Sequence, residues 1–383
     1  MRERWGKHEI LGVVSNHIVD YPTPANLSYG WGFGSLAGLS LVVQIITGVF
    51  LAMHYCSNVE LAFGSVEHIM RDVNNGWILR YFHSNGASIF FFVVYLHMFR
   101  GLYYGSYSNP RGHLWMSGVM LFFIMIITGF IGYVLPWGQM SLWGATVITN
   151  LVSAVPLVGK NIVEWLWGGF SVDNATLNRF YSLHYLLPFI LAGLSLVHII
   201  LLHIDGSSNR LGVETKLDKI GFYPYCYVKD LFLFLVLFSI LSYFVFFNPN
   251  VLGHPDNYIR ADSMVTPAHI VPEWYFLPFY AILRTITHKL GGVIAMVLSI
   301  VGLMALPFIN TSEVRSGAFR PITRKLFWLF VVDSVLLGWI GQKAVEYPYQ
   351  EIGQVLGVYY FTFLFILLPV VSRLESSIMR GRV

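Results

Sequence analysis

The sequence predicts an all-α integral membrane protein with eight transmembrane helices. Of its 383 residues, 56% are hydrophobic and only 11% are charged, whereas about 25% of residues are charged in an ordinary soluble domain. Eight apolar stretches approach or reach the roughly 17–25 residues that a helix needs to cross the hydrocarbon core of a bilayer. These stretches are 33–53, 77–99, 114–135, 183–204, 231–247, 292–309, 326–341 and 355–371. A soluble globular fold is therefore a poor explanation of this chain.

Basic residues are unevenly distributed between the two sides of the predicted bundle. With eight spans, both termini and the connections 100–113, 205–230 and 310–325 fall on one side, and together they carry 16 of the 24 Lys and Arg. Loops rich in Lys and Arg stay on the cytoplasmic side of a membrane. We therefore expect the termini on the matrix or cytoplasmic face. The alternative explanation is that basic residues simply collect in any loop.

Two long connections fall on the opposite, outer side and divide the chain into two regions. The first, an amphipathic loop at about 136–175, contains prolines and paired glycines, and the second, at about 248–290, is rich in Pro, His and aromatic residues. Long ordered loops are often functional. We expect a histidine-bearing four-helix bundle over 1–205, including the first loop, and a second four-helix region over 206–383, including the second.

Four histidines form two pairs with the same spacing. His83 and His97 in the second predicted span are fourteen residues apart, and so are His184 and His198 in the fourth. Fourteen residues of α-helix advance about 21 Å and complete about 3.9 turns, so the two side chains of a pair face nearly the same direction at two depths. The two spans run in the same direction. We therefore expect His83 beside His184 at one level and His97 beside His198 at the other.

Paired imidazoles inside a membrane indicate a metal. Ionisable side chains in hydrocarbon are costly and normally face a bundle interior with a partner. The two cysteines, Cys56 and Cys226, fall in no ligand-like spacing, and no nearby carboxylates complete a zinc site, so two imidazoles per level fit axial ligation of a haem iron best. A single buried histidine is more often an ordinary hydrogen-bonded core residue. Four at matched spacing predict two haems.

Glycines repeat the same spacing in the other two spans of the bundle. Gly34 and Gly48 in the first span, and Gly118 and Gly132 in the third, are again fourteen residues apart. Because glycine has no side chain, these positions would let the helix backbones approach the rims of two porphyrins. The alternative is ordinary packing of membrane helices, which favours small residues anyway.

Two arginines lie at the ends of the histidine pairs. Arg80 comes one turn before His83, and Arg100 comes one turn after His97. Arginine can form two parallel hydrogen bonds with a carboxylate, so both are candidates for binding haem propionates. The alternative is that each arginine extends its charged end to the membrane boundary.

Several long strings resemble cytochrome b of the respiratory cytochrome bc complex, over essentially the whole chain. The segment 106–117 and the spans after about 310 match the family less well. The matching strings are DVNNGWILRYFHSNGAS (72–88), GYVLPWGQMSLWGATVITNL (132–151), WGGFSVDNATLNRFYSLHYLLPF (167–189), GHPDNY (253–258) and PEWYFLPFYAILR (272–284). The resemblance implies that His83 and His184 bind the low-potential haem near the outer face, and that His97 and His198 bind the high-potential haem near the inner face.

The resemblance also implies a quinol-oxidising pocket on the outer side. Glu273, within the string PEWY, Tyr133, Gly144 and Tyr280 match positions that line it in the family. A quinol loses two protons as it loses two electrons, and a carboxylate with a pKa near neutral can accept one of them. Gly144 would leave room for the quinone ring. Without the resemblance, Glu273 would be taken as a loop acid at the membrane interface.

A second, quinone-reducing pocket is implied on the inner side. His203, Asp230, Ser35, Ser207 and Lys229 match family positions there. An imidazole and a carboxylate on opposite quinone oxygens form a plausible pair of proton donors for quinone reduction. As isolated residues they would more often be polar groups at the membrane boundary.

The resemblance implies the catalytic subunit of a quinol:cytochrome c oxidoreductase. Electrons would pass through two non-covalently bound b haems from ubiquinol at the outer pocket to ubiquinone at the inner pocket, coupled to proton translocation. The expected partners are a Rieske iron-sulfur protein, a membrane-anchored c-type cytochrome and other complex III subunits, within a homodimeric complex in the lipid bilayer. The expected location is the mitochondrial inner membrane with termini in the matrix, and no nucleic-acid partner is expected.

Two other interpretations make different predictions. The photosynthetic relative would have a shorter four-span chain, a separate subunit carrying PEWY, and one more residue between the histidines of the fourth span. A transporter or a purely structural membrane subunit could also have eight spans and buried histidines. A transporter or a structural subunit would not need two matched histidine pairs and would show no haem spectrum.

Overall fold

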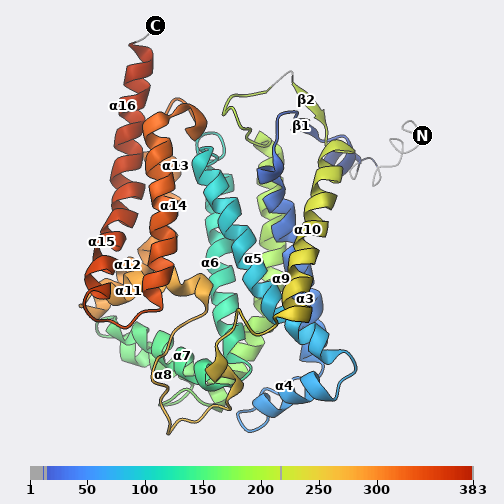
Figure 1. Cartoon of the computed structure of the whole chain (residues 1–383), viewed down its shortest axis with the longest axis vertical. Helices are drawn as coiled ribbons and strands as arrows, with labels where there is room; N and C mark the ends of the chain where they lie inside the picture. Colours follow the sequence, from blue (N-terminus) through green and yellow to red (C-terminus); the bar gives the residue numbers. More distant parts are fainter. Residues whose placement is uncertain (1–11, 13–14, 216–217, 382–383) are drawn as a thin grey trace.

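The computed structural model describes residues 12, 15–215 and 218–381, and these residues form a bundle of long helices with short helices at one end (Figure 1). A two-stranded antiparallel sheet, in which Thr23 pairs with Ile220, lies at the other end. The α-helices are α3 (Phe33–Ala52), α4 (Ala62–Arg71), α5 (Gly76–Tyr103), α6 (Gly112–Val134), α7 (Gln139–Asn150), α8 (Gly159–Trp167), α9 (Asn174–Asp205), α10 (Tyr225–Phe247), α11 (Leu277–Thr285), α12 (Lys289–Val301), α13 (Leu306–Ile309), α14 (Pro321–Gly341), α15 (Tyr349–Thr362) and α16 (Leu368–Arg380). The strands are β1 (Pro22–Pro24) and β2 (Lys219–Gly221), and the short helices are η1 (Ser15–Val19), η2 (Tyr29–Gly32), η3 (Leu151–Ala154), η4 (Pro255–Tyr258), η5 (Trp274–Phe276), η6 (Gly302–Ala305), η7 (Gly317–Phe319) and η8 (Phe363–Leu367).

Seven helical segments of the described chain are long and apolar enough to cross a membrane. Some are longer than the sequence predicted, because polar turns extend the apolar stretches. They are Tyr29–Ala52, Gly76–Tyr103, Gly112–Val134, Asn174–Asp205, Tyr225–Phe247, Lys289–Ile309 and Tyr349–Arg380. The helices therefore indicate an integral membrane protein. By length and composition they give seven spans, one fewer than the sequence predicted.

The predicted span 326–341, the seventh in chain order, corresponds to α14, which is long enough to cross a membrane but carries too much charge. The helix has 21 residues, and Arg324 and Lys325 near its start are followed by Asp333 in its middle. The Asp333 side chain is only 3% exposed. A carboxyl in the centre of a span makes the helix less apolar than its neighbours. The apolar stretch of α14 therefore carries more charge than those of the seven candidate spans, although the helix packs against α11, α15 and α16.

Helices from the two halves of the chain share one core. In the N-terminal half, α3 packs against α5 and α9, and α6 packs against α9. One cluster of buried side chains then joins α5 and α6 to α11 and α12, including Phe91, Phe122, Phe279 and Ile300. A second cluster places α10 against α3 and α5 rather than against the other C-terminal helices. The helices that carry the four predicted ligand histidines and the loop with PEWY are therefore held in direct contact.

Hydrogen bonds gather the predicted inner connections at one end of the molecule. Ser106 contacts Ser208 at 2.9 Å, Asn310 donates to Ser108 at 2.7 Å, and Ser316 donates to the Arg210 carbonyl at 2.8 Å. Figure 1 shows β1, β2 and the end of α16 at this same end. The described parts of the chain near both termini thus lie on one side, as the even number of predicted spans requires.

The predicted outer loops meet at the opposite end, where Figure 1 shows α4, α7 and α8. Ser141 donates to Asn257 at 2.9 Å, Asp262 donates from its backbone to Gln139 at 2.9 Å, and Lys289 donates to Ser153 at 2.8 Å. These contacts join the first loop, which contains α7 and α8, to the second, which contains η4 and η5. The two loops form one structured surface.

Candidate functional site

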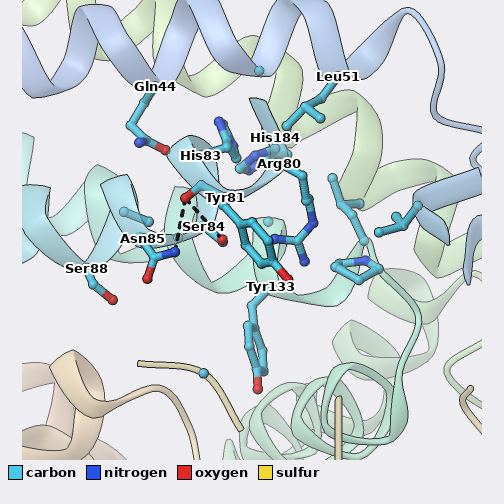
Figure 2. Close-up of a pocket in the computed structure, with 18 of the residues that line it drawn as sticks. Gln44, Leu51, Arg80, Tyr81, His83, Ser84, Asn85, Ser88, Tyr133 and His184 are labelled. Carbon is cyan, nitrogen blue, oxygen red and sulfur yellow. Dashed lines mark hydrogen bonds between the residues drawn. The ribbon is translucent and has the colours of Figure 1, made fainter. Parts of the chain in front are cut away.

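The four predicted ligand histidines face one another in two pairs. The ring centroids of His83 and His184 are 6.2 Å apart, and those of His97 and His198 are 6.4 Å apart. Figure 2 shows His83 and His184 pointing toward each other from helices on opposite sides of a cavity. Two metal–nitrogen bonds of about 2 Å each, on opposite sides of one ion, place ring centroids roughly 6 to 6.5 Å apart. Both pairs therefore have the separation of two axial ligands on one ion.

Hydrogen bonds fix the orientation of three of these rings through their Nδ1 atoms. His83 Nδ1 lies 2.9 Å from Thr47 Oγ1, His184 Nδ1 lies 2.9 Å from the Thr128 carbonyl, and His198 Nδ1 lies 2.7 Å from Ser117 Oγ. Both hydroxyls already donate to carbonyls of their own helices, so they accept from the imidazole. The proton is then on Nδ1, which leaves the Nε2 lone pair available for a metal.

The fourth ring, His97, has a different partner. Arg100 Nη2 lies 3.1 Å from His97 Nδ1, and a guanidinium can only donate. His97 Nδ1 therefore accepts in this arrangement, which places the ring proton on Nε2. Arg100 Nε has no hydrogen-bond partner among the described residues, although the guanidinium lies over the Trp31 ring. The arginine is therefore a donor with unused capacity next to the ring.

Each of the four predicted glycines lies against one of the four histidines. A Cβ added at Gly34 would be 3.3 Å from His97 Cε1, one at Gly48 would be 3.1 Å from His83 Cε1, and one at Gly118 would be 3.2 Å from His198 Cε1. At Gly132 a Cβ would overlap the His184 ring. The structure thus assigns these glycines to the space behind the imidazoles. Their predicted contact with porphyrin rims stays a prediction.

The His83 and His184 pair opens into a cavity of about 570 Å³. Gly48, Gly132 and Arg80 line it, together with Tyr133 and Glu273 at the outer end. Gln44 also lines it, and its Nε2 is buried without a hydrogen-bond partner among the described residues. A cavity of this size with unpaired donors and apolar walls suits a large flat ligand with polar edges.

The residues present fit a haem better than a bare metal ion. Across residues 12, 15–215 and 218–381, no three His, Cys, Asp or Glu side chains lie close enough to hold a metal ion. An ion between two imidazoles therefore needs its other ligands from outside the chain. A porphyrin supplies four nitrogens in a plane and leaves two axial positions for the histidines.

The four residues predicted for the outer pocket line one small cavity. Tyr133, Gly144, Glu273 and Tyr280 surround a space of about 30 Å³. Nothing lies within 4 Å of a Cβ placed at Gly144, so a side chain there would extend into the open space. Tyr133 and Glu273 also line the larger cavity beside His83 and His184. These two residues therefore stand between the two cavities.

Burial sets the acidity of the carboxyl at this boundary. Burial raises the pKa of Glu273 to about 7, although the Tyr133 hydroxyl and the Arg80 charge both act to lower it. Near neutral pH the group is present in both forms, which is the condition for accepting and releasing a proton. The arrangement can therefore take a proton from the small cavity and release it into the larger cavity, which Glu273 also lines.

The residues predicted for the inner pocket lie at the end of the molecule that holds β1 and β2. Lys229 donates to the Leu27 carbonyl and lies over the Tyr29 ring at 5.2 Å. The Asp230 carboxylate lies close to Gly32, since a Cβ there would be 3.0 Å from Oδ1. Ser35 donates to the Gly32 carbonyl at 2.8 Å. These three side chains thus share the region around η2 and the start of α10.

His203 and Ser207 lie where α9 ends. Ser207 donates to the Ser208 carbonyl at 3.0 Å. His203 Nδ1 lies 3.1 Å from His17 Nδ1, in η1, with the two rings parallel to within 1°, and the Tyr21 ring stacks on His203 at 4.2 Å. No direct contact between His203 and Asp230 is described, so their joint role at one quinone stays a prediction.

Sequence reasoning missed several neighbours of the predicted residues. Thr47 and Ser117, which orient two of the histidines, directly precede Gly48 and Gly118. The hydroxyl residue directly before each of these two glycines could have indicated a hydrogen bond to the nearby imidazole. His17 carried no such signal, because only the fold brings the N-terminal segment to the end of α9.

Comparison with known proteins identifies the family. Residues 18–206 match the family model described as cytochrome b/b6/petB, and residues 260–361 match that described as cytochrome b(C-terminal)/b6/petD. Cytochrome b of Marchantia polymorpha is 64% identical over 375 residues, covering 98% of this chain and 93% of the relative. Cytochrome b of Chondrus crispus is 61% identical over 381 residues, covering 99% and 100%.

A solved structure agrees with these relatives. A chain from a structure titled hyperthermophilic respiratory complex III is 32% identical, with a TM-score of 0.92 over 98% of this chain and 99% of that chain. The N-terminal and C-terminal family models both match this one continuous chain. The chain therefore belongs to the cytochrome b family, as the electron-transferring membrane subunit of quinol:cytochrome c oxidoreductase, respiratory complex III.

Proposed function

We propose that this subunit binds two b-type haems non-covalently, one between His83 and His184 and one between His97 and His198. The observation that supports this most strongly is the repeated unit of two facing imidazoles, each with a glycine behind it. Each haem, when bound, supplies an iron that gains and loses one electron. The chain would supply two imidazole ligands to each haem and would hold the two pairs at two depths of the bundle.

The two predicted arginines provide cationic ends for the sites. Arg80 lines the cavity at the His83 level, and Arg100 lies beside His97. A propionate is a stronger acceptor for a guanidinium than an imidazole nitrogen is. We propose that Arg100 turns from His97 Nδ1 to a propionate, which frees the ring to place its proton on Nδ1 and its lone pair on Nε2.

The outer cavity is the proposed site of ubiquinol oxidation. Glu273 accepts a proton from the quinol hydroxyl, because its carboxyl is half ionised near pH 7. Tyr133 and Tyr280 line the cavity, and Gly144 leaves open space beside it for the ring. Glu273 also lines the larger cavity, so the proton can leave on the side away from the quinol.

The inner site is proposed to reduce ubiquinone. His203 and Asp230 donate the two protons that the quinone takes up, while Ser35, Ser207 and Lys229 provide polar contacts around the ring. The support for this site is that all five residues lie at the end opposite the outer cavity. Oxidation at one end with proton release, and reduction at the other with proton uptake, together move protons across the membrane.

The partners and the location are proposed on the basis of the family and of the charge distribution. We propose a homodimeric complex with a Rieske iron-sulfur protein, a membrane-anchored c-type cytochrome and other complex III subunits. We also propose the mitochondrial inner membrane, with the termini and the β1–β2 end in the matrix. The excess of Lys and Arg in the connections at that end supports this orientation.

Ligand variants test the haem assignment. His97→Leu is expected to lose the haem of the inner level and to retain haem at the His83 level, because the two sites share no ligand. The measurement is pyridine-haem quantitation with low-temperature reduced-minus-oxidised spectra of the assembled complex. His113→Leu, an exposed histidine of α6, is the control and should keep both haems. Full haem content in His97→Leu would remove the proposed pairing.

A further inference from the structure

One helix, α5, carries one histidine of each facing pair, and it also contacts the segment that follows Glu273. Besides His83 and His97, it presents three side chains to η5, the short helix that begins at the residue after Glu273. Ser88, Phe91 and Tyr95 are spaced by three and four residues, so they lie on one face of the helix. That face is about a third of a turn away from the face of the histidines.

Two hydrogen bonds join this face to η5. The Trp274 indole Nε1 donates to Ser88 Oγ at 3.1 Å. The Tyr95 hydroxyl donates to the backbone carbonyl of Tyr275. Ser88 is only 3% exposed, so its hydroxyl is shielded from water. The helix η5 is thus held at two consecutive residues, at Trp274 through its side chain and at Tyr275 through its backbone carbonyl.

Aromatic packing completes the contact between the two bonds. The rings of Phe91 and Tyr275 stack at a centroid distance of 4.0 Å and an angle of 5°. Phe91 also lies edge-on to Phe276 at 5.4 Å, and Phe276 lines the outer cavity. The packed aromatic rings therefore leave η5 little freedom to slide along α5.

These contacts determine where Glu273 lies. The residue directly precedes Trp274 and has extended backbone angles, φ −54° and ψ 149°, so its position follows that of η5. A displacement of about 1 Å of a reacting group can cost on the order of 10²-fold in rate. Holding η5 on the haem-bearing helix therefore fixes the carboxyl relative to the His83 site as well as to the outer cavity.

We propose that Ser88, Phe91 and Tyr95 are positioning residues for quinol oxidation, which hold Glu273 by anchoring η5 to the helix that carries His83 and His97. The proposal rests on the proposed function of the outer cavity. Ser88 and Phe91 also line the larger cavity, whereas Tyr95 lines neither cavity, which makes Tyr95 the cleanest probe of the positioning role. The three side chains act through the hydrogen bonds to Trp274 and Tyr275 and through the aromatic stack.

The test is Tyr95→Phe, which keeps the ring and removes only the hydroxyl that holds the Tyr275 carbonyl. We expect both haems to remain, kcat for a short-chain ubiquinol to fall roughly three- to thirty-fold, and the pH midpoint of the rate to shift because Glu273 moves relative to Tyr133. Electron entry through the inner pocket should not change. The measurements are steady-state kinetics from pH 5.5 to 9 and haem spectra of the whole complex.

Tyr360→Phe is the matched control. Its hydroxyl also donates to a backbone carbonyl, that of Ser299, at 2.7 Å, but in the core of the C-terminal helices. This variant should leave kcat and the pH midpoint of quinol oxidation unchanged. If Tyr95→Phe fails to assemble with haem, Ser88→Ala is measured instead, with the same expected loss of rate and shift of midpoint.

Unchanged kcat and pH midpoint in a haem-replete Tyr95→Phe or Ser88→Ala complex would overturn the proposal. A separate result distinguishes this from failure of the proposed function. If Glu273→Gln left quinol oxidation unaffected, the role of the carboxyl would fail. The positioning role would then be judged by the affinity of a non-oxidisable quinol analogue for the outer cavity. We expect Tyr95→Phe to weaken that affinity and Tyr360→Phe to leave it as it was.

Discussion

At the scale of single residues, the proposed oxidation of quinol depends on one carboxyl, Glu273, whose pKa is shifted to near neutral. Glu273 is a partly buried carboxyl whose pKa is raised to about 7 by desolvation, so it is neutral at acid pH and charged at alkaline pH. Only the charged form can accept a proton from quinol. The rate of quinol oxidation should therefore rise with pH through about 7 and then level off.

Replacing Glu273 tests this directly. In Glu273→Gln the side chain cannot accept a proton, so at pH 8 quinol oxidation should fall on the order of 10²-fold. At pH 6 the gap between wild type and variant should be smaller, because most of the wild-type carboxyl is already protonated there. The measurement is the ubiquinol oxidation rate of the complex from pH 5.5 to 9.

Glu164→Gln is the control for this experiment, since Glu164 is an α8 residue at the same end of the molecule whose partner is the exposed Lys160. It should keep the wild-type pH profile. A Glu273→Gln profile that still rises through pH 7 would assign the titration to another group.

At the scale of elements, the C-terminal helices depend on one buried ion pair. Glu375 of α16 accepts from Arg320 Nε at 3.1 Å, from the backbone amides of Ile322 and Thr323 at 2.8 and 3.1 Å, and from Thr323 Oγ1 at 2.6 Å. Both charged side chains are 3% exposed. The carboxylate thus caps the N-terminus of α14, where a negative charge is favourable.

Removing this charge should destabilise the packing of α14 on α16. Glu375→Gln leaves Arg320 buried without its counter-charge and directs an amide N–H₂ toward donors, so we expect a loss of about 3–5 kcal/mol. The measurement is the unfolding free energy or midpoint of the detergent-solubilised complex. Glu313→Gln breaks the exposed pair with Arg380 and should cost no more than about 1 kcal/mol. Equal effects of the two variants would contradict the assignment.

The sequence predicted which elements exist better than where they begin. The fourth span was expected from 183, but α9 begins at Asn174, because Asp173 and Thr176 form a capping box that apolar periodicity does not register. The sequence predicted a span at 326–341 within α14, but Arg324, Lys325 and Asp333 together give this helix more charge than the apolar stretches of the seven candidate spans carry. The matched spacing of the histidines correctly predicted the two facing pairs. Helix geometry fixes the direction and depth of two side chains fourteen residues apart.

At the scale of the whole molecule, the two long loops could be placed on one side from the sequence, but their mutual contacts could not. The bond from Ser141 to Asn257 joins residues 116 positions apart. The anchoring of η5 on α5 through Tyr95 is equally non-local, at 180 positions. Such contacts come from tertiary packing, and the hydrophobic periodicity of a single segment does not predict which distant residue it will contact. The outer cavity therefore had to be inferred from resemblance before the fold showed its residues together.

The central claim is that one chain holds two b-type haems at two levels. The measurement that tests it most directly is a dithionite-reduced minus oxidised spectrum at 77 K, with pyridine-haem quantitation on the purified complex. We expect two b-type haems per chain with resolvable bands, because the two pairs differ in their surroundings: Arg100 contacts His97, and Thr47 contacts His83. One b-type haem per chain, or none, in a folded preparation would contradict the account.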